Sequence, residues 1–412
     1  MKLPPVAVEQ TQPGGDAPRK SLWTMVLTST PVALTVVATI LAAVSSSEMT
    51  LAQYHRALAA QNQSKASDQW NFFQFKRSRG MMTQLSIDFF HALSYRGSIK
   101  AETWQVSDRL LEDLRKVEKE ANALLERLRQ AKASPTGDRL MQRLAEFASQ
   151  SQAFLHRAES LKDQLSRELG RKEVQHALAV VETKELPPAK INRLEEPAIA
   201  EALKAVANRQ SESETAPAIS KIPETTLRQA IDLLEANVQA VEEANKPISD
   251  LLSRLDTLLQ QQTDLADDLH QAALSLKRTN GGTGDSPAQN DVLQALGRLV
   301  QSTAETKKLA QDFSNEFKVA QYGYAVRRYE TEARHNQKAA ELYEVQIRRS
   351  STLSEKHRDR SRHFFYGMLV AQAGVTIASF SLAMKHRSFF WSLAGLAGLG
   401  AVVFSSWVYL YK

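Results

Sequence analysis

The residues best suited to metal or acid–base chemistry are dispersed along this 412-residue chain. The nine histidines include no pair spaced four apart around a glutamate, which is the arrangement on the helix of a zinc protease. His357 and His363 are six residues apart among arginines, a poor place for a bound cation. Cysteine is absent, which excludes disulfides, thiolate zinc sites and cysteine nucleophiles. The titratable residues therefore predict no metal site.

Motifs for nucleotide or acyl chemistry do not occur either. Gly281-Gly282-Thr283-Gly284 is glycine-rich, but no Gly-Lys-Ser/Thr follows it and no predicted strand precedes it, so it is a poor phosphate cradle. No Gly-x-Ser-x-Gly elbow is found, and acidic residues occupy the flanks of predicted helices, where a solvated face is the ordinary role. Heptad bundles seldom provide a concave substrate pocket. We expect no enzymatic activity, no cofactor and no small-molecule substrate.

The overall charge is only mildly basic. The formal net charge is +6, and the isoelectric point is near 9.3. Binding to nucleic acid would require a dense basic face, and this mild excess of positive charge fits basic residues beside apolar runs better. We therefore expect no nucleic-acid partner.

Three uncharged runs are long enough for helices that cross a bilayer, which needs about 20 apolar residues. They are residues 21–47, 364–384 and 388–411, and Lys385-His386-Arg387 separates the last two as a tight turn. Residues 1–20 contain four prolines and two glycines and predict a disordered tail. A signal peptide is the alternative for 21–47, but the run is too long and lacks a clear cleavage site. The lipid bilayer is thus the first predicted partner.

Small residues recur at helical spacing along each predicted span. They are Thr35, Ala38, Ala42 and Ser45 in the first, Gly367, Ala371, Gly374 and Ala378 in the second, and Ala394, Gly398, Ala401 and Ser405 in the third. Lipid gives no hydrophobic drive for helix association, so close approach at small residues has to supply it. We predict that the spans pack together here, although alanine and glycine are also simply common in spans. No span holds an ionisable residue, which argues against a pump or coupled transporter.

Residues 48–98 predict a stalk helix that carries the most distinctive local motif, Asp68-Gln69-Trp70-Asn71-Phe72-Phe73-Gln74-Phe75-Lys76. An apolar stripe continues from it, made of Phe75, Met82, Leu85, Phe89 and Ala92. The aromatic face could bind a partner or form a core layer against another helix of the same chain. We favour the core layer.

Apolar residues then step by alternating four and three, as in coiled-coil packing. Residues 101–185 predict an antiparallel helix pair, interrupted at Ser134-Pro135, and 186–223 a short helix and linker. Residues 224–278 predict a long heptad helix, with Asn245 and Gln262 on its seam, where polar residues can fix the register.

A flexible loop is expected at 279–290 and a return helix at 291–363. Since the first span ends and the second begins at the same membrane face, residues 48–96 and 319–363 should run antiparallel as a stalk. The predicted fold is all-α: a three-span membrane protein with a long antiparallel helical, coiled-coil extramembrane region and no strand.

The motif residues Asp68, Gln69, Trp70, Phe73, Gln74 and Lys76, just past the first span, resemble a signature of the bacterial membrane family called domain of unknown function 4337. The C-terminal part is also similar, with Tyr329, Glu332-Ala333 and His363 before a span. The resemblance covers the first span, about 48–95 and about 318–412, with an added helical region at roughly 100–315. The family has no assigned activity, so the resemblance implies topology and no catalytic residue.

The charges beside the spans point to an orientation. Arg19-Lys20 before the first span and Glu48 after it favour a cytoplasmic N-terminal tail, with the helical region extracytoplasmic and the chain integral to the cytoplasmic (inner) membrane. The basic cluster at 356–362 argues for the reverse orientation.

The sequence favours a membrane-anchored coiled-coil scaffold that binds a second copy, as a homo-oligomer, or a partner coiled coil. One alternative is a signal relay that works with a separate output protein, which requires an uninterrupted helix into the second span. Another is a pore-forming oligomer, although no polar lining face is evident.

Overall fold

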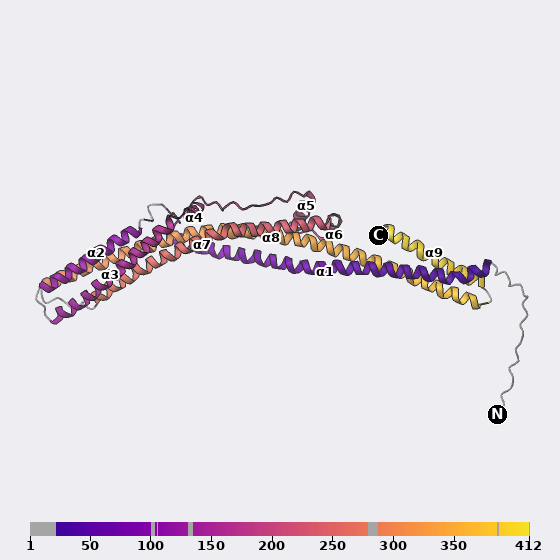
Figure 1. The fold of residues 1–412 in the computed structure, drawn as a ribbon, viewed down its shortest axis with the longest axis horizontal. Helices are drawn as coiled ribbons and strands as arrows, with labels where there is room; N and C mark the ends of the chain where they lie inside the picture. The colour runs from indigo at the N-terminus through magenta and orange to yellow at the C-terminus, as the bar shows by residue number, and fades with distance from the viewer. Residues whose placement is uncertain are drawn as a thin grey trace, which may run out of the picture. The chain divides into compact units, whose positions relative to one another are not determined.

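The structure is a computed structural model. The residues it describes are 22–99, 104, 106–130, 135–278, 287–384 and 387–411. Within those ranges there are helices and no strand, which confirms the all-α prediction. The helices, shown in Figure 1, are α1 (Leu22–Ala92), α2 (Val106–Gln130), α3 (Pro135–Leu169), α4 (Lys172–Thr183), α5 (Pro197–Ala207), α6 (Glu212–Ile219), α7 (Glu224–Arg278), α8 (Pro287–Ala383) and α9 (Arg387–Tyr411).

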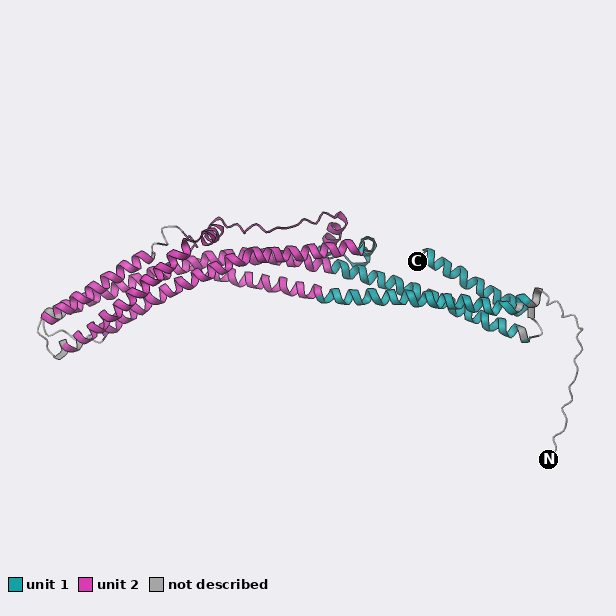
Figure 2. Cartoon of the chain, viewed as in Figure 1, with its two compact units in different colours: residues 1–64, 205–223, 344–412 teal, residues 65–204, 224–343 magenta. Residues whose placement is uncertain are grey.

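The chain divides into two compact units, coloured separately in Figure 2. Unit 1 comprises Met1–Ser64, Ala205–Pro223 and Glu344–Lys412, and unit 2 comprises Lys65–Lys204 and Glu224–Tyr343. The helices α1 and α8 contribute residues to both units. Three helices, α1, α8 and α9, contain stretches long and apolar enough to cross a membrane.

Local signals set several helix ends. Proline is the first residue of α3, α5 and α8, where its missing N–H removes no helical hydrogen bond. The helix α6 lies in the part predicted as linker, which is a correction to that prediction. Its start is a capping box: the Ser211 hydroxyl accepts from the Glu214 N–H, and the Glu214 carboxylate accepts from the Ser211 N–H.

The turn after α1 is held by one carboxylate of α8. Glu316 accepts hydrogen bonds from the backbone N–H groups of Arg96 (3.0 Å), Gly97 (2.5 Å) and Ser98 (3.1 Å). Gly97 has a φ of +71°, and a Cβ there would lie 2.9 Å from Val319 Cγ1. Glycine is therefore needed at this position for both its backbone angle and its close approach to α8.

The core of unit 2 is built from leucine-rich helix faces. One cluster joins α2, α3, α7 and α8 and includes Leu114, Leu144, Leu269 and Leu296. A second cluster joins α3, α4, α7 and α8 and includes Val174, Leu255, Phe317 and Tyr324.

The helices α1 and α8 run antiparallel within each unit. In unit 2, Lys76 contacts Glu332, and Tyr95, in the turn just after α1, contacts Asp312, further back along α8. In unit 1, Ser45 contacts Ser361, and Ala52 contacts Ser354. Partner numbers on α8 fall as those on α1 rise, as the predicted stalk requires.

Several predictions fall wholly or partly outside the described residues. They are the tail at 1–20, the part of the expected loop at 279–286, and two residues of the turn, Lys385 and His386.

Candidate functional site

A row of large apolar side chains on α1 is exposed in unit 2. It consists of Phe72 (54% exposed), Phe75 (51%), Met82 (69%), Leu85 (68%) and Phe89 (63%), and we call it the α1 stripe. The core layer that we favoured for the aromatic face of the motif is therefore wrong for Phe72 and Phe75. Periodicity identified the face but not what covers it.

The opposite face of α1 packs within unit 2. Ala66, Gly80 and Ile87, spaced by fourteen and seven residues, are buried. The position of a Cβ on Gly80 would lie 3.6 Å from Tyr329 Cβ of α8. This segment of α1 thus has two faces that follow a seven-residue repeat, and only one of them is covered.

Lys76 of the family-like motif joins a polar network between α1, α7 and α8. Its Nζ donates to Glu332 Oε2 at 2.5 Å and to Glu242 Oε1 at 3.0 Å. Glu332 is 1% exposed and also accepts from Arg328 Nε at 2.8 Å. Burial by itself lowers the pKa of Lys76, but its hydrogen bonds to Glu332 and Glu242 outweigh that effect and raise the pKa. The network therefore pairs the buried Glu332 carboxylate with two cations, and Glu242 joins it from the surface.

The other motif residues lie differently. Trp70 and Phe73 are half-buried and meet edge to face, with ring centroids 5.5 Å apart. Gln69 is also half-buried, whereas Asp68 and Gln74 are exposed. Only Lys76 among them belongs to the charged network.

The two polar residues predicted on the seam of α7 are buried in unit 2. Asn245 Oδ1 accepts from the Tyr324 hydroxyl at 2.9 Å, and burial raises the pKa of Tyr324 to about 12. Gln262 Nε2 donates to Ser107 Oγ at 3.2 Å. Each polar seam residue has a partner on another segment, so a shift of register would leave a buried polar group unpaired.

Small residues line the inside of unit 1. Eight of the nine predicted packing positions are buried, namely Ala38, Gly367, Ala371, Gly374, Ala378, Ala394, Gly398 and Ala401, while Ala42 is half-buried. Leu34 of α1 packs against two of them, because a Cβ on Gly374 or Gly398 would lie 3.4 Å or 2.3 Å from its methyl carbons. Thr35, which we expected to face inward, is exposed, and Leu34 takes that place.

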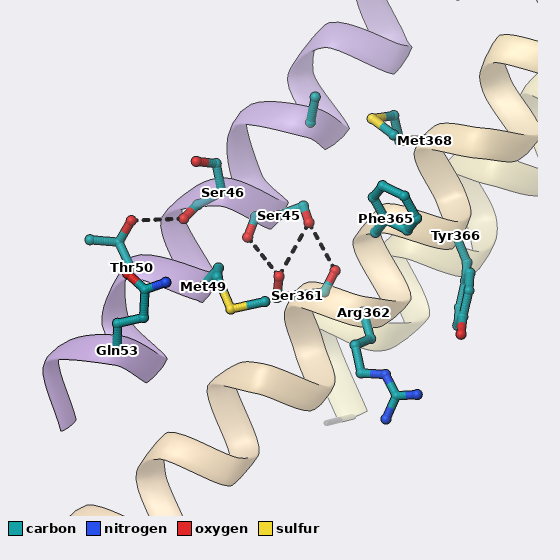
Figure 3. A pocket seen from close by; sticks show the side chains of 11 residues that line it. Ser45, Ser46, Met49, Thr50, Gln53, Ser361, Arg362, Phe365, Tyr366 and Met368 are labelled. Carbon is teal, nitrogen blue, oxygen red and sulfur yellow. Dashed lines mark hydrogen bonds between the residues drawn. The ribbon is translucent and has the colours of Figure 1, made fainter. Parts of the chain in front are cut away.

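A pair of serines joins α1 to α8 in unit 1. Ser45 Oγ donates to the Ser361 carbonyl at 2.9 Å, and Ser361 Oγ donates to the Ser45 carbonyl at 2.8 Å, as Figure 3 shows. One turn further along α1, Glu48 Oε2 lies 2.6 Å from His357 Nδ1. The His357 ring stacks on His55 at 5.5 Å.

A pocket of about 670 Å³ lies beside the serine pair, between α1 and α8. Its lining changes character from one end to the other. Ala42, Met49, Phe365 and Met368 are apolar, whereas Ser46, Thr50, Gln53 and Arg362 are polar or charged, and Met49 lies among the polar residues of α1. No sequence pattern indicated this pocket, because each helix contributes only part of its wall.

The described residues include no group of three or more histidine, aspartate or glutamate side chains placed to hold a metal ion. The features that remain are an uncovered apolar face in unit 2 and an amphipathic pocket in unit 1. Both suit binding.

No curated protein and no solved structure matches this chain. A family model does match, over a range that includes most of the first predicted span and the motif at 68–76. The range continues through residues that we had assigned to an added region, and it ends before 318–412, where the resemblance stays a prediction. Residues 28–182 match the family described as a domain of unknown function (DUF4337), which confirms the resemblance over the first predicted span.

Proposed function

We propose that the protein is a non-enzymatic, membrane-anchored helical scaffold that pairs with a second copy through the α1 stripe. Residues 21–47, 364–384 and 388–411 anchor it in the bilayer. The observation that carries the proposal is the exposure of five large apolar side chains on a helix whose opposite face is already packed.

The outward surface of unit 1 supports anchoring. Large apolar side chains such as Val36, Ile40, Leu369 and Leu396 point outward from α1, α8 and α9, while alanine and glycine face inward. Soluble proteins rarely expose contiguous apolar surface of this kind. In lipid, the exposure of apolar side chains carries no unfavourable free energy. Small residues favour close helix packing there.

The area of the α1 stripe and its flanking residues approaches that of a stable interface. A buried aromatic side chain covers roughly 150–250 Å², so side chains exposed by half to two-thirds offer on the order of 100 Å² each. With the flanking Met81 and Leu93, which are also exposed, the face offers on the order of 700 Å². A stable interface buries roughly 800 Å² per partner.

Anchoring in one bilayer favours a second copy as the partner that covers the α1 stripe. It also determines the direction of the partner's α1 helix. Two copies in one bilayer present α1 in the same direction, so the pairing is parallel and residues with the same number meet. Phe75, Met82 and Phe89 are spaced by seven, as the central positions of a parallel coiled coil are. The stripe itself holds no charge, and the nearby Arg79 guanidinium covers the ring of its own Phe75 at 4.5 Å.

The absence of native cysteine allows a direct test. We expect Met82→Cys, in membranes under mild oxidation, to give a disulfide-linked dimer, because identical central positions lie within disulfide reach. Gln84→Cys is the matched control, since Gln84 is exposed but lies off the stripe. Equal crosslinking of the two variants, or none with Met82→Cys, would contradict pairing through this face.

A signal relay is favoured by a different observation. The helix α8 is continuous over Pro287–Ala383, so one helix joins residues of unit 2 to the second predicted span. If α8 relays strain, closing the Met82→Cys disulfide will change amide hydrogen exchange at 344–363. Unchanged exchange there favours the passive scaffold.

The proposed orientation has the N-terminal tail in the cytoplasm and the helical region outside it. A reporter inserted at Gly282 tests this side of the membrane. A cytoplasmic signal would reverse the orientation and leave the scaffold proposal intact.

A further inference from the structure

We infer that the pocket between α1 and α8 in unit 1 binds the phosphate ester of an anionic phospholipid. Arg362 holds the phosphate, and an acyl chain follows Ala42, Phe365 and Met368. This inference rests on the membrane-anchoring half of the proposed function. It adds a specific ligand to a protein for which only generic contact with the bilayer was expected.

The pocket has the size and the polarity of a lipid site. Its volume of about 670 Å³ lies within the range of small-molecule pockets, roughly 300–1,000 Å³. In Figure 3, Phe365 and Met368 lie at one end, while Thr50 and Gln53 lie at the other. A phospholipid has the same division between an apolar chain and a polar headgroup.

The pocket lies where both helices change from polar to apolar. On α1 the uncharged run ends just before Glu48, and on α8 the last arginine, Arg362, comes two residues before Phe364, where the apolar run begins. A bilayer that covers the two apolar runs therefore places its headgroups at the level of Arg362. Basic residues at this level attract anionic lipids.

The charges around the pocket favour an anion at Arg362. Arg362 has no hydrogen-bond or ion-pair partner in the part of the chain that the structure describes, and it is one of the residues that line the pocket. The facing carboxylate, Glu48, is paired with His357. Residues 355–362 contain four basic and two acidic side chains. A guanidinium without a carboxylate partner is well suited to bind a phosphate through two N–H groups.

The test uses the full chain in detergent, with native mass spectrometry after titration with dioleoyl-phosphatidylglycerol or dioleoyl-phosphatidylcholine. We expect the phosphatidylglycerol to bind more tightly. Arg362→Gln should weaken its binding about tenfold, because charge-assisted hydrogen bonds to the phosphate are lost. Arg358→Gln is the matched control: it removes the same charge from the same helix, but Arg358 pairs with Glu355 and does not line this pocket.

Equal losses in the two arginine variants would overturn the inference, since they would indicate attraction to the basic surface as a whole. Ala42→Leu narrows the apolar end and should weaken phosphatidylglycerol binding while helical content, followed by circular dichroism, stays unchanged. If inorganic phosphate competes as well as the lipid and Ala42→Leu has no effect, the site takes free phosphate and the lipid assignment is wrong.

Failure of the anchoring proposal is measured separately. Extraction of cell membranes at alkaline pH releases the protein if it is not integral, which overturns the proposed function. Retention in the membrane without preference for phosphatidylglycerol overturns only the lipid site.

Discussion

The two units use the same secondary structure with opposite arrangements of side chains. Along the apolar runs of unit 1, most buried residues are alanine, glycine or serine, with larger ones such as Leu34 and Phe364 among them, and many exposed residues are valine, isoleucine, leucine or phenylalanine. Unit 2 buries leucine, phenylalanine and tyrosine and exposes most of its charged side chains. In water, apolar burial stabilises a helix bundle, whereas in lipid close packing of small residues has to do so. The contrast shows that the helices alone do not distinguish the two units. The residue types on the buried and exposed faces of those helices do.

The α1 stripe is the exception within unit 2. There, one helix face has the apolar character of a core position and the exposure of a surface position. Our proposal resolves this by making the surface an interface with a second copy.

The largest expected effect comes from placing the same substitution in both units. Leu255→Ala in α7 removes a side chain that is 1% exposed, and we expect it to destabilise unit 2 by about 3 kcal/mol through lost burial and a cavity. Leu396→Ala in α9 removes a side chain that is 67% exposed and should change stability by about 0.5 kcal/mol or less. Urea unfolding of the full chain in detergent, followed by circular dichroism, measures both. Equal effects would contradict the opposite arrangement of the two units.

The next effect separates a buried ion pair from an exposed one. Lys76→Met removes one partner of the Glu332 carboxylate, which Arg328 still contacts. We therefore expect the free energy of unfolding to fall by about 2 kcal/mol. Adding Glu332→Gln should recover part of the loss, which a double-mutant cycle would measure. Arg115→Met is the control, because the Arg115–Glu159 pair is exposed and is worth at most about 1 kcal/mol.

The smallest effect is a dependence of unit 2 on alkaline pH. Burial raises the pKa of Tyr324 to about 12, and burial together with a hydrogen bond to Glu235 raises the pKa of Tyr343. A raised pKa in the folded state gives stability that is complete below the unfolded pKa, about 10 for tyrosine, and is lost as pH rises through the folded value. We expect the urea midpoint to fall between pH 10 and pH 12.

In Tyr324→Phe that fall should be smaller, because one of the groups that titrate is gone. A fall of the same size in this variant and in the unchanged chain would show that Tyr324 does not contribute. Tyr54→Phe is a control at an exposed tyrosine of unit 1.

The fold was largely predictable from local patterns. The four-and-three steps from Leu227 to Leu276 identified the inward face of α7, and Asn245 and Gln262 were recognised as polar residues within it. The α6 helix was missed because its start depends on two side chains, Ser211 and Glu214, in a stretch too short to show a period. The pocket beside Ser45 and Ser361 could not be predicted, since the two walls are more than 300 residues apart.

The sequence by itself determined that the chain is helical, that three stretches are apolar enough to cross a bilayer, and which face of each helix is apolar. Only the tertiary structure decided which of those faces the chain covers with its own residues. The physical reason is that periodicity records how a helix divides its surface, whereas burial depends on whether another segment arrives there. On α1, Ile87 is covered and Met82 is not, although both lie on apolar faces of the same helix.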